Sequence, residues 1–284
     1  MGGIYWIASY PKSGNTWFRT FLENLQNGGD RPAHINELSG NSIASSRSWI
    51  DDVLGVETAD LTFDEIDRLR PAVYDWATTY DSVSYHKIHD ANRLTSQGEP
   101  LISRRGTLGA VYILRNPLDV APSLANHNGS TIDEAITALG NPDYALAGSE
   151  HRWHRQVRQV LGSWSGHVAS WIDSPALTCH VLRYEDMHTA ALESFAAAAR
   201  FLKLPDAAER VAQAIRFSEF SVVAQQEAEV GFRERPSRAE RFFRQGRAGG
   251  WQAQLTPQQV DRIIADHGPM MQRFGYLDAS GAPV

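Results

Sequence analysis

The stretch IYWIASYPKSGNTWFR, residues 4–19, decides the fold that the sequence predicts. An apolar run leads into a turn of Pro, Ser and Gly, and apolar residues at helix-face spacing follow at once. Strand, tight loop and helix in this order are typical of a loop that binds phosphate at a helix N-terminus. The common form of that loop ends in Gly-Lys-Thr, whereas here Gly14 is followed by Asn15 and Thr16. The lysine stands earlier in the loop, as Lys12.

The composition is that of an ordinary globular protein. The chain has 284 residues, of which 42% are hydrophobic and 21% charged, and its formal net charge is −6. This acidity argues against nucleic-acid binding, so an anion site has to be made by a local group of cations. The single cysteine, Cys179, allows neither an internal disulfide nor a zinc site of the cysteine type, which favours a reducing cytoplasm. We expect no membrane span and no signal peptide, because no long apolar run and no basic leader are present.

Four short apolar or β-branched runs, each followed by polar or turn residues, predict strands at Ile4–Ser9, Val83–Lys87, Ala110–Arg115 and His180–Tyr184. Helical stretches separate them. This order predicts an α/β fold with a P-loop-like central parallel sheet flanked by helices on both faces. Ligands in such folds bind at the carboxyl ends of strands, so functional residues are expected in the loops that follow the four runs.

The longest helix is expected from Glu150 to Ile172. Its apolar stripe consists of Trp153, Val157, Leu161, Trp164, Val168 and Trp171. The tryptophans can be read as core residues or as a ligand box, and helix-face spacing favours the core.

The last helix carries clear signals at both ends. Thr256 is placed as N-cap, Pro257 as the first helical residue and Gln259 as the partner in a capping box. The helix is expected to run to Phe274, with Gly275 as its C-cap.

We expect a single domain over residues 1–284, with excursions at 28–80 and 224–250 that form an acceptor site and a flap. The second excursion contains an arginine run with few acids: Arg233, Arg235, Arg238, Arg241, Arg244 and Arg247. The run is either a solvated surface loop or a flap that orders over an anion. On so acidic a chain the flap is favoured.

The strand before Arg115 decides what kind of phosphate ligand is expected. A nucleoside-triphosphate hydrolase holds magnesium with a loop Ser or Thr and an aspartate that ends a neighbouring strand. Here that strand ends in Arg115, which repels a metal and attracts a second phosphate. The sequence therefore predicts a nucleotide whose two phosphate ends are bound by protein cations without magnesium.

The residues after Arg115 begin a helix. Asn116 is placed as its cap, Pro117 as its first residue, and Asp119 lies in its first turn. Ser123 follows about two turns along. Taken alone, Arg115 and Asp119 could form a plain structural ion pair.

Four segments in order resemble the signatures of the cytosolic-type sulfotransferases: YPKSGNTW, RNPLDVAPS, RYEDM and FRQGRAGGW. They extend from residue 10 to residue 251, so the resemblance covers nearly the whole chain. It implies that the nucleotide is 3′-phosphoadenosine 5′-phosphosulfate (PAPS), a donor with two separate phosphate ends, and that the product is adenosine 3′,5′-bisphosphate (PAP). The variant WIASYPKSGNTW resembles that of bacterial small-molecule enzymes.

The resemblance also implies donor-binding roles. The phosphate loop, residues 11–16, would hold the 5′-phosphosulfate through Lys12, Ser13, Gly14, Asn15 and Thr16, with Lys12 neutralising charge on the bridging oxygen as the sulfuryl group leaves. Trp17 would stack on adenine, Tyr184 would reach the adenine side, and Phe220 would pack near the base. The 3′-phosphate would be bound by Arg115 and Ser123, under a closing loop that contains Arg244, Gln245 and Gly246.

The segment SYHKIHDA carries the candidate base. Lys87 and His89 fall on one face of a strand and resemble the Lys-x-His pattern of the family. That resemblance implies that His89 takes the proton of an acceptor hydroxyl while Lys87 holds the transferring sulfonate. Without it, His89 is an ordinary polar residue at a strand end. His86 and His89 could also be half a zinc site, but no further ligand is evident and we expect no metal.

The chain departs from the family pattern at several positions. Asp90 stands where an apolar residue is frequent, Gln245 where a lysine is usual, and Gly250 where an aspartate is usual. Arg247 could supply the charge missing at Gln245. The usual dimer motif is not visible after Trp251, which leaves a monomer or a homodimer open.

These observations predict a cytoplasmic PAPS-dependent sulfotransferase that acts on a hydroxyl, or second an amine, of a small molecule or natural product. One alternative is a P-loop small-molecule kinase that uses ATP and magnesium. The other is a nucleotide-binding protein without catalysis.

Overall fold

The computed structural model describes residues 2–38, 43–149, 153–235, 241–244 and 246–284. The chain forms two compact units. The first comprises Met1–Tyr10, Gly40–Tyr112 and Pro142–Val181. The second comprises Pro11–Ser39, Ile113–Asn141 and Leu182–Val284.

The central feature is a four-stranded parallel sheet in the order β2-β1-β3-β6. Its strands are β1 (Gly3–Ser9), β2 (Val83–Ile88), β3 (Thr107–Leu114) and β6 (Cys179–Arg183). All four predicted strands are therefore confirmed, with ends that differ by no more than three residues. Every residue of β1 is buried, as expected of a parallel strand covered on both faces. The predicted α/β class with a parallel sheet flanked by helices is confirmed.

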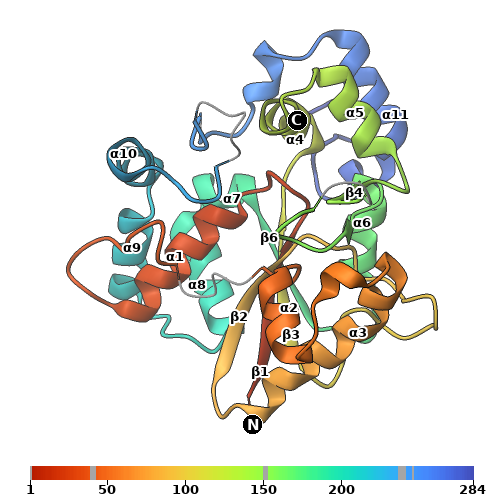
Figure 1. The fold of residues 1–284 in the computed structure, drawn as a ribbon. Coiled ribbons are helices and arrows are strands. Elements are labelled where there is room, and N and C mark those ends of the chain that lie inside the picture. Colours follow the sequence, from red (N-terminus) through yellow and green to blue (C-terminus); the bar gives the residue numbers. More distant parts are fainter. Residues whose placement is uncertain (1, 39–42, 150–152, 236–240, 245) are drawn as a thin grey trace. The chain divides into compact units, whose positions relative to one another are not determined.

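The first unit surrounds β1 and β2 with short elements. They are α2 (Arg47–Leu54), η1 (Thr58–Asp60), α3 (Phe63–Trp76), η2 (Ala77–Thr79), β4 (Ala145–Leu146), β5 (Gln159–Val160) and α6 (Trp164–Ile172). α2 packs against α3 (Figure 1), and β4 pairs with β5 in antiparallel fashion. The register of β1 on β2 runs from Gly3 opposite Val83 to Ala8 opposite Ile88, which places the ends of both strands together.

The prediction of one long helix from Glu150 to Ile172 is wrong. Residues 150–152 lie outside the described part of the chain, and α6 begins only at Trp164. Gly162 takes a left-handed φ of 67°, and the side chain of Ser163 caps the helix by accepting from the Gly166 amide. Residues 159–160 instead pair with β4.

The apolar stripe that suggested the long helix is nevertheless mostly core. Trp164 and Trp171 are fully buried, whereas Trp153 is 66% exposed. The tryptophans of α6 are thus core residues, as favoured, but the spacing before residue 164 belongs to an extended segment.

The second unit is helical. Its elements are α1 (Asn15–Asn27), α4 (Pro117–Asn128), α5 (Ile132–Gly140), α7 (Tyr184–Thr189), α8 (Ala191–Phe201), α9 (Ala208–Phe217), α10 (Phe220–Val230), η3 (Gly250–Ala253) and α11 (Pro257–Arg273). α9 packs on both α1 and α8, and α4, α5 and α11 form a second group (Figure 1).

The predicted starts of the helices α4 and α11 are confirmed. Asn116 accepts from the Leu118 amide at the start of α4, and Thr256 forms a reciprocal capping box with Gln259 at the start of α11. α11 ends at Arg273, one residue earlier than expected, and its C-cap is Phe274 rather than the predicted Gly275, which follows with a left-handed φ of 70°.

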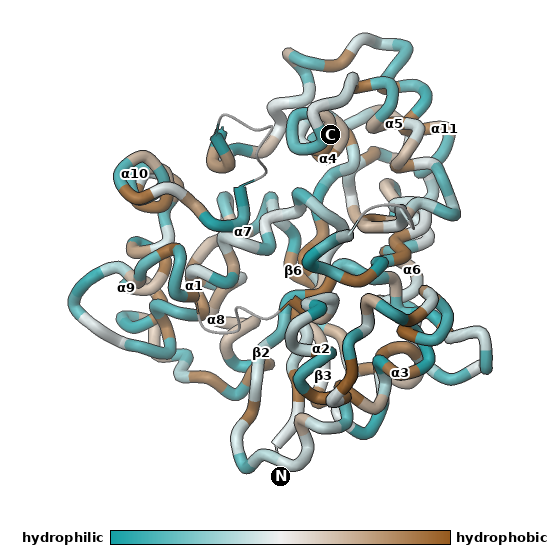
Figure 2. The backbone as a smooth tube through the Cα atoms, viewed as in Figure 1, coloured by the Kyte–Doolittle hydropathy of each residue, from teal (hydrophilic) through white to brown (hydrophobic). Residues whose placement is uncertain are grey.

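The hydropathy of the chain follows this architecture. Figure 2 shows hydrophobic stretches around β6 and α6 and hydrophilic residues along many of the connecting loops. Among the described helices, none has the length and apolar content that crossing a membrane requires.

Candidate functional site

The phosphate loop is shaped by two left-handed residues. Lys12 has φ 69° and Gly14 has φ 102°, and Gly14 is the N-cap of α1. Gly14 supplies no side chain to cap the helix, so the amides of the first turn face the loop. A Cβ at Gly14 would lie 2.6 Å from the ring of Tyr184, so only glycine fits both the conformation and the space.

Two side chains at this loop carry buried polar atoms that lack a hydrogen-bond partner among the described residues. They are the hydroxyl of Ser13, which is 1% exposed, and the indole N–H of Trp17. Buried polar atoms are rarely left unsatisfied, because desolvation costs about 1–3 kcal/mol each. Together with the uncapped start of α1, they indicate a ligand with acceptor oxygens. Asn15 and Thr16 are also buried beside them.

Arg115 joins the phosphate loop to a distant part of the chain. One guanidinium nitrogen donates to the carbonyl oxygen of Lys12 at 2.9 Å, and another donates to the carbonyl of Arg247 at 3.1 Å. Its Nε–H is buried without a partner in the described part of the chain. The guanidinium also lies over the ring of Tyr184, 4.2 Å from the ring centre. Arg115 is therefore a fixed cation beside the loop, with N–H groups left for an anion.

Asp119 does not pair with Arg115 in the described structure. Its carboxylate accepts from the amides of Gly249 at 2.7 Å and Trp251 at 2.9 Å, and the residue is 4% exposed. The plain ion pair considered from the sequence is thus absent among the described residues. Asp119 instead holds the closing segment, which we define as residues 241–244 and 246–251.

The closing segment has a second anchor in α10. The carboxylate of Glu227 accepts from the amides of Phe242 and Phe243 at 2.7 and 2.9 Å. The Nζ of Lys12 lies 4.3 Å from the centre of the Phe242 ring. The structure therefore places an aromatic face of the closing segment on the loop lysine, a contact that sequence reasoning missed. The aromatic pair immediately before Arg244 was the available signal.

The other residues of the predicted closing loop vary in their surroundings. Gly246 lies against the ring of Phe220, so closely that a Cβ would overlap it, which brings these two predicted residues together. Arg244 is exposed and donates to Gln254 at 3.1 Å. Gln245 and Arg238 lie outside the described residues.

Ser123, the other residue predicted to bind the 3′-phosphate, is half-buried in α4, two turns from its start.

An aromatic cluster surrounds Trp17. Tyr184 meets its ring edge-on at 5.7 Å, and His188 lies 4.7 Å from it between centroids. The structure thus brings Trp17 and Tyr184 together, and it adds His188, which the sequence analysis did not single out. Burial lowers the pKa of His188, and the nearby Arg115 guanidinium lowers it further.

His89 lies in the first unit, one residue beyond the end of β2, and is 9% exposed. Its ring Nδ1 is 2.8 Å from the carbonyl oxygen of Ser9 and 3.4 Å from the Ser9 hydroxyl. Because a carbonyl can only accept, Nδ1 carries the proton of the neutral ring. Nε2 is then the basic nitrogen, which is the arrangement that a general base requires.

Lys87 is half-buried at the end of β2, and its carbonyl accepts from the Ala44 amide at 2.8 Å. Lys87 and His89 belong to the first unit, whereas the donor-binding residues belong to the second. The two groups of residues are close in the sequence: Ser9, whose carbonyl binds the His89 ring, precedes Lys12 by three residues.

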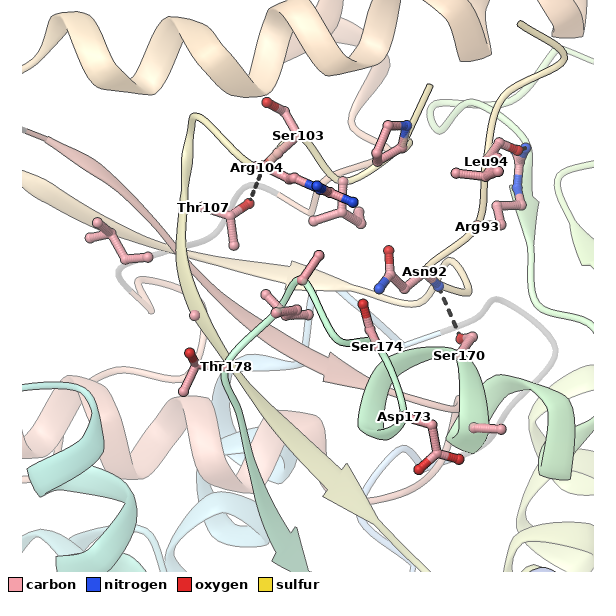
Figure 3. Close-up of a pocket in the computed structure, with 17 residues that line it drawn as sticks. Asn92, Arg93, Leu94, Ser103, Arg104, Thr107, Ser170, Asp173, Ser174 and Thr178 are labelled. Carbon is pink, nitrogen blue, oxygen red and sulfur yellow. Dashed lines mark hydrogen bonds between the residues drawn. The ribbon is translucent and has the colours of Figure 1, made fainter. Parts of the chain in front are cut away.

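A separate cavity of about 380 Å³ lies in the first unit (Figure 3). It opens where β3 and β6 begin, and its polar lining includes Asn92, Arg93, Ser103, Arg104, Ser170 and Asp173. None of the predicted site residues lines it. The cavity is thus at the amino ends of two strands, away from the carboxyl ends where ligands of such folds bind.

The family model described as "Sulfotransferase domain" matches residues 4–275. Among curated proteins, Cytosolic sulfotransferase 17 of Arabidopsis thaliana is 22% identical over 97% of this chain and 76% of its own length. Sulfotransferase 2A2 of Mus musculus is 24% identical over 90% of this chain and 79% of its own length.

Two solved structures share the fold. The mouse sulfotransferase SULT7A1 complexed with PAP aligns with a TM-score of 0.60 and 18% identity, over 95% of this chain and 84% of its own. Retinol dehydratase in complex with androsterone and inactive cofactor PAP aligns with a TM-score of 0.59 and 17% identity, over 95% and 80%.

Proposed function

The chain belongs to the sulfotransferase domain family, and on that premise we propose that it transfers the sulfuryl group of PAPS to a hydroxyl of a small-molecule acceptor. A sulfate ester and PAP are the products. The observation that carries this proposal is the hydrogen bond from the Arg115 guanidinium to the Lys12 carbonyl. It lies beside the uncapped start of α1 and the Ser13 hydroxyl, which has no partner among the described residues.

The donor-binding residues fit a nucleotide with two anionic ends. The loop amides and the Ser13 hydroxyl suit the 5′-phosphosulfate, and Arg115 with Ser123 suits the 3′-phosphate. Trp17 and Tyr184 offer an aromatic surface for adenine, and Phe220 lies against Gly246 of the closing segment. Arg244, Gln245 and Gly246 are assigned to the 3′-phosphate side, with Arg247 as the added cation. The solved relatives named above were crystallised with PAP, which supports this donor.

The proposed reaction is an in-line displacement at sulfur. The acceptor oxygen forms a bond to sulfur as the bond from sulfur to the bridging phosphate oxygen breaks, and PAP leaves. His89 Nε2 takes the acceptor proton. Lys12 neutralises the charge that develops on the bridging oxygen, and Lys87 holds the sulfonate during transfer.

The two alternatives are less well supported. A P-loop kinase needs an acidic magnesium ligand at the strand end that Arg115 occupies, and the family assignment does not favour it. A nucleotide-binding protein without catalysis would not need a histidine held in the Nδ1–H tautomer.

The proposed acceptor class is argued from one of the solved structures. Retinol dehydratase was crystallised with androsterone, and we propose an acceptor of that size bearing a hydroxyl, with an amine as second choice.

We further propose that residues 1–284 form one sulfotransferase domain, with the excursions 28–80 and 224–250 contributing the acceptor site and flap. We also propose a cytoplasmic enzyme without nucleic-acid or membrane partners, which fits the composition. The motif variant WIASYPKSGNTW supports a bacterial enzyme, and a monomer and a homodimer both stay open.

A binding comparison tests the donor assignment. Thermal unfolding is measured with PAP and with ATP plus magnesium, each with and without EDTA. PAP is expected to raise the unfolding temperature strongly whether or not chelator is present. Stabilisation by ATP and magnesium alone would reject the proposal.

A further inference from the structure

The segment that follows His89 is held by an ion pair shut off from solvent. Asp90 and Arg70 are both 0% exposed, and the two side chains form a bidentate pair with distances of 2.9 and 2.7 Å. The Arg70 Nε also donates to the Tyr74 hydroxyl at 2.8 Å. A buried pair of this kind seldom adds net stability over apolar residues, because desolvating two charges is costly. Its presence directly after the candidate base calls for a role in placing that segment.

His167 of α6 contacts His89 itself. Its Nε2 lies 3.0 Å from the His89 carbonyl oxygen, and its Nδ1 lies 2.8 Å from the Tyr112 hydroxyl. Since the carbonyl can only accept, Nε2 carries the proton and the Tyr112 hydroxyl donates to Nδ1. Burial lowers the pKa of His167 to about 4, so the ring is neutral near pH 7 and this donor pattern is constant.

The next three residues are tied to the same region. The Trp171 indole donates to the Asp90 carbonyl at 3.0 Å, and the Ala91 amide donates to the Val160 carbonyl at 2.8 Å. The Asn92 amide donates to the Ser170 hydroxyl at 3.1 Å, as the dashed line in Figure 3 shows. Together with His167, the α6 residues Ser170 and Trp171 therefore hold the backbone immediately after the base.

His89 lies just past the end of the sheet ladder. The ladder between β1 and β2 ends with Ala8 opposite Ile88, one residue before His89. The hydrogen bond from His167 fixes the peptide that follows His89, while Ser9 fixes the ring. Backbone and ring are thus set by two independent contacts, both within the first unit.

We propose that His167 is a positioning residue for His89: it holds the His89 carbonyl so that the ring keeps Nδ1 on Ser9 and turns Nε2 to the acceptor. The buried Asp90–Arg70 pair supports the same geometry one residue later. The inference rests on the proposed function, because positioning is useful only if His89 acts as the base.

The test compares two substitutions at His167. His167→Phe removes both ring nitrogens, whereas His167→Gln keeps an N–H group at the end of the side chain that can reach the His89 carbonyl. With saturating PAPS and an accepted small hydroxyl compound, we expect His167→Phe to lower kcat by about 10- to 100-fold, the cost of displacing a reacting group by up to 1 Å. His167→Gln should keep most of the wild-type kcat, and both variants should bind PAP with wild-type affinity.

His267 provides the matched control. It is another buried histidine, 1% exposed with a pKa lowered to about 4 by burial, and it lies in α11 of the second unit. His267→Phe is expected to lose stability like His167→Phe but to keep kcat. If His167→Phe fails to fold, Trp171→Phe removes the donor to the Asp90 carbonyl and serves in its place, with a loss of kcat again expected.

A spectroscopic readout separates this inference from the proposed function. Long-range proton–nitrogen spectra of histidine-labelled protein report the tautomer of each ring without any turnover. Wild-type His89 should be in the Nδ1–H form, and His167→Phe should give a mixture of tautomers that His167→Gln restores. An unchanged His89 tautomer in His167→Phe, or an unchanged kcat in an active enzyme, would overturn the proposal. Absence of wild-type turnover would instead count against the proposed function alone.

Discussion

The Nδ1 of His89 lies 2.8 Å from the carbonyl oxygen of Ser9, and this contact determines which ring nitrogen can accept a proton. The same residue that holds the ring is part of β1, whose end leads into the phosphate loop. The base and the donor loop are therefore connected through one short piece of chain.

The first prediction follows from this contact. His89→Ala should lower kcat by about 10²- to 10⁴-fold, the range of general base catalysis, and leave PAP affinity nearly unchanged. Steady-state kinetics and calorimetric titration measure the two quantities. His86→Phe is the control, because His86 lies on β2 three residues earlier and stacks on Trp49 at 4.5 Å. Full turnover in His89→Ala would remove that residue from its assigned role.

The second prediction concerns Arg115. Arg115→Ala removes charge-assisted hydrogen bonds worth about 1.5–3 kcal/mol, so PAP affinity should fall by roughly 10- to 100-fold. Arg262→Ala, in the same unit, loses an exposed ion pair with Asp133 at 2.8 Å and an exposed hydrogen bond to the Thr137 hydroxyl at 3.3 Å, and it should bind PAP normally. Equal affinities in the two variants, measured by calorimetry, would place the 3′-phosphate elsewhere.

The third prediction separates backbone strain from steric overlap at Gly14. Gly14→Ala and Gly55→Ala both force alanine into a left-handed conformation, which costs roughly 1–2 kcal/mol. A Cβ at Gly55 has open space, whereas one at Gly14 meets the Tyr184 ring. Gly14→Ala should therefore be the less stable variant and should lose PAP binding. Thermal unfolding and PAP titration decide this, and normal PAP binding by Gly14→Ala would argue against the loop as the phosphate site.

The fourth prediction concerns the anchor of the closing segment. Asp119→Asn leaves one carbonyl oxygen where two carboxylate oxygens now accept from Gly249 and Trp251. We expect faster hydrogen exchange at these two amides and a higher KM for PAPS, with kcat at saturating PAPS changed less. Asp133→Asn, an exposed acid of the same unit, should change neither quantity. Wild-type exchange rates in Asp119→Asn would show that the carboxylate does not hold the segment.

The fifth prediction concerns stability in acid. Burial lowers the pKa of His167 and of His267 to about 4, below the ordinary value of 6.5, so the unfolded chain binds protons before the folded one does. Their contribution is fully present above the unfolded pKa and is lost as the pH falls toward 4; it amounts to up to about 3 kcal/mol for each ring. His267→Gln should therefore flatten the fall in unfolding free energy, measured in urea, between about pH 6.5 and about pH 4.5. An unchanged slope would show that His267 titrates normally in the folded protein.

Much of the fold is readable because its signals are local. The four strands are short apolar runs, and the starts of α4 and α11 are marked by caps within four residues. The segment before Trp164 was misread because its helix-like spacing competes with antiparallel pairing to residues 145–146 and a left-handed Gly162. Those effects depend on strand pairing and on one dihedral angle, which apolar spacing does not encode.

The candidate site likewise has residues that local motifs reveal and residues whose partners lie far away in the sequence. The phosphate loop and Arg115 stand in contiguous motifs and could be predicted from the sequence. The partners of Asp119 lie 130 and 132 residues away, and His167 lies 78 residues from the carbonyl that it binds. An acid in the first turn of a helix looks like a helix-stabilising charge, so nothing nearby indicated that Asp119 holds the closing segment.

Transfer of a sulfuryl group from PAPS to a small hydroxyl compound can be measured on the protein itself. The most direct measurement incubates the protein and its His89→Ala variant with PAPS labelled in the sulfuryl group and a panel of phenols and alcohols, followed by separation of nucleotide and products. We expect label in a sulfate ester, with one PAP formed for each ester, for the wild type alone. Label that stays on the nucleotide with every acceptor, in wild type and variant alike, would rule out sulfuryl transfer by this chain to these acceptors.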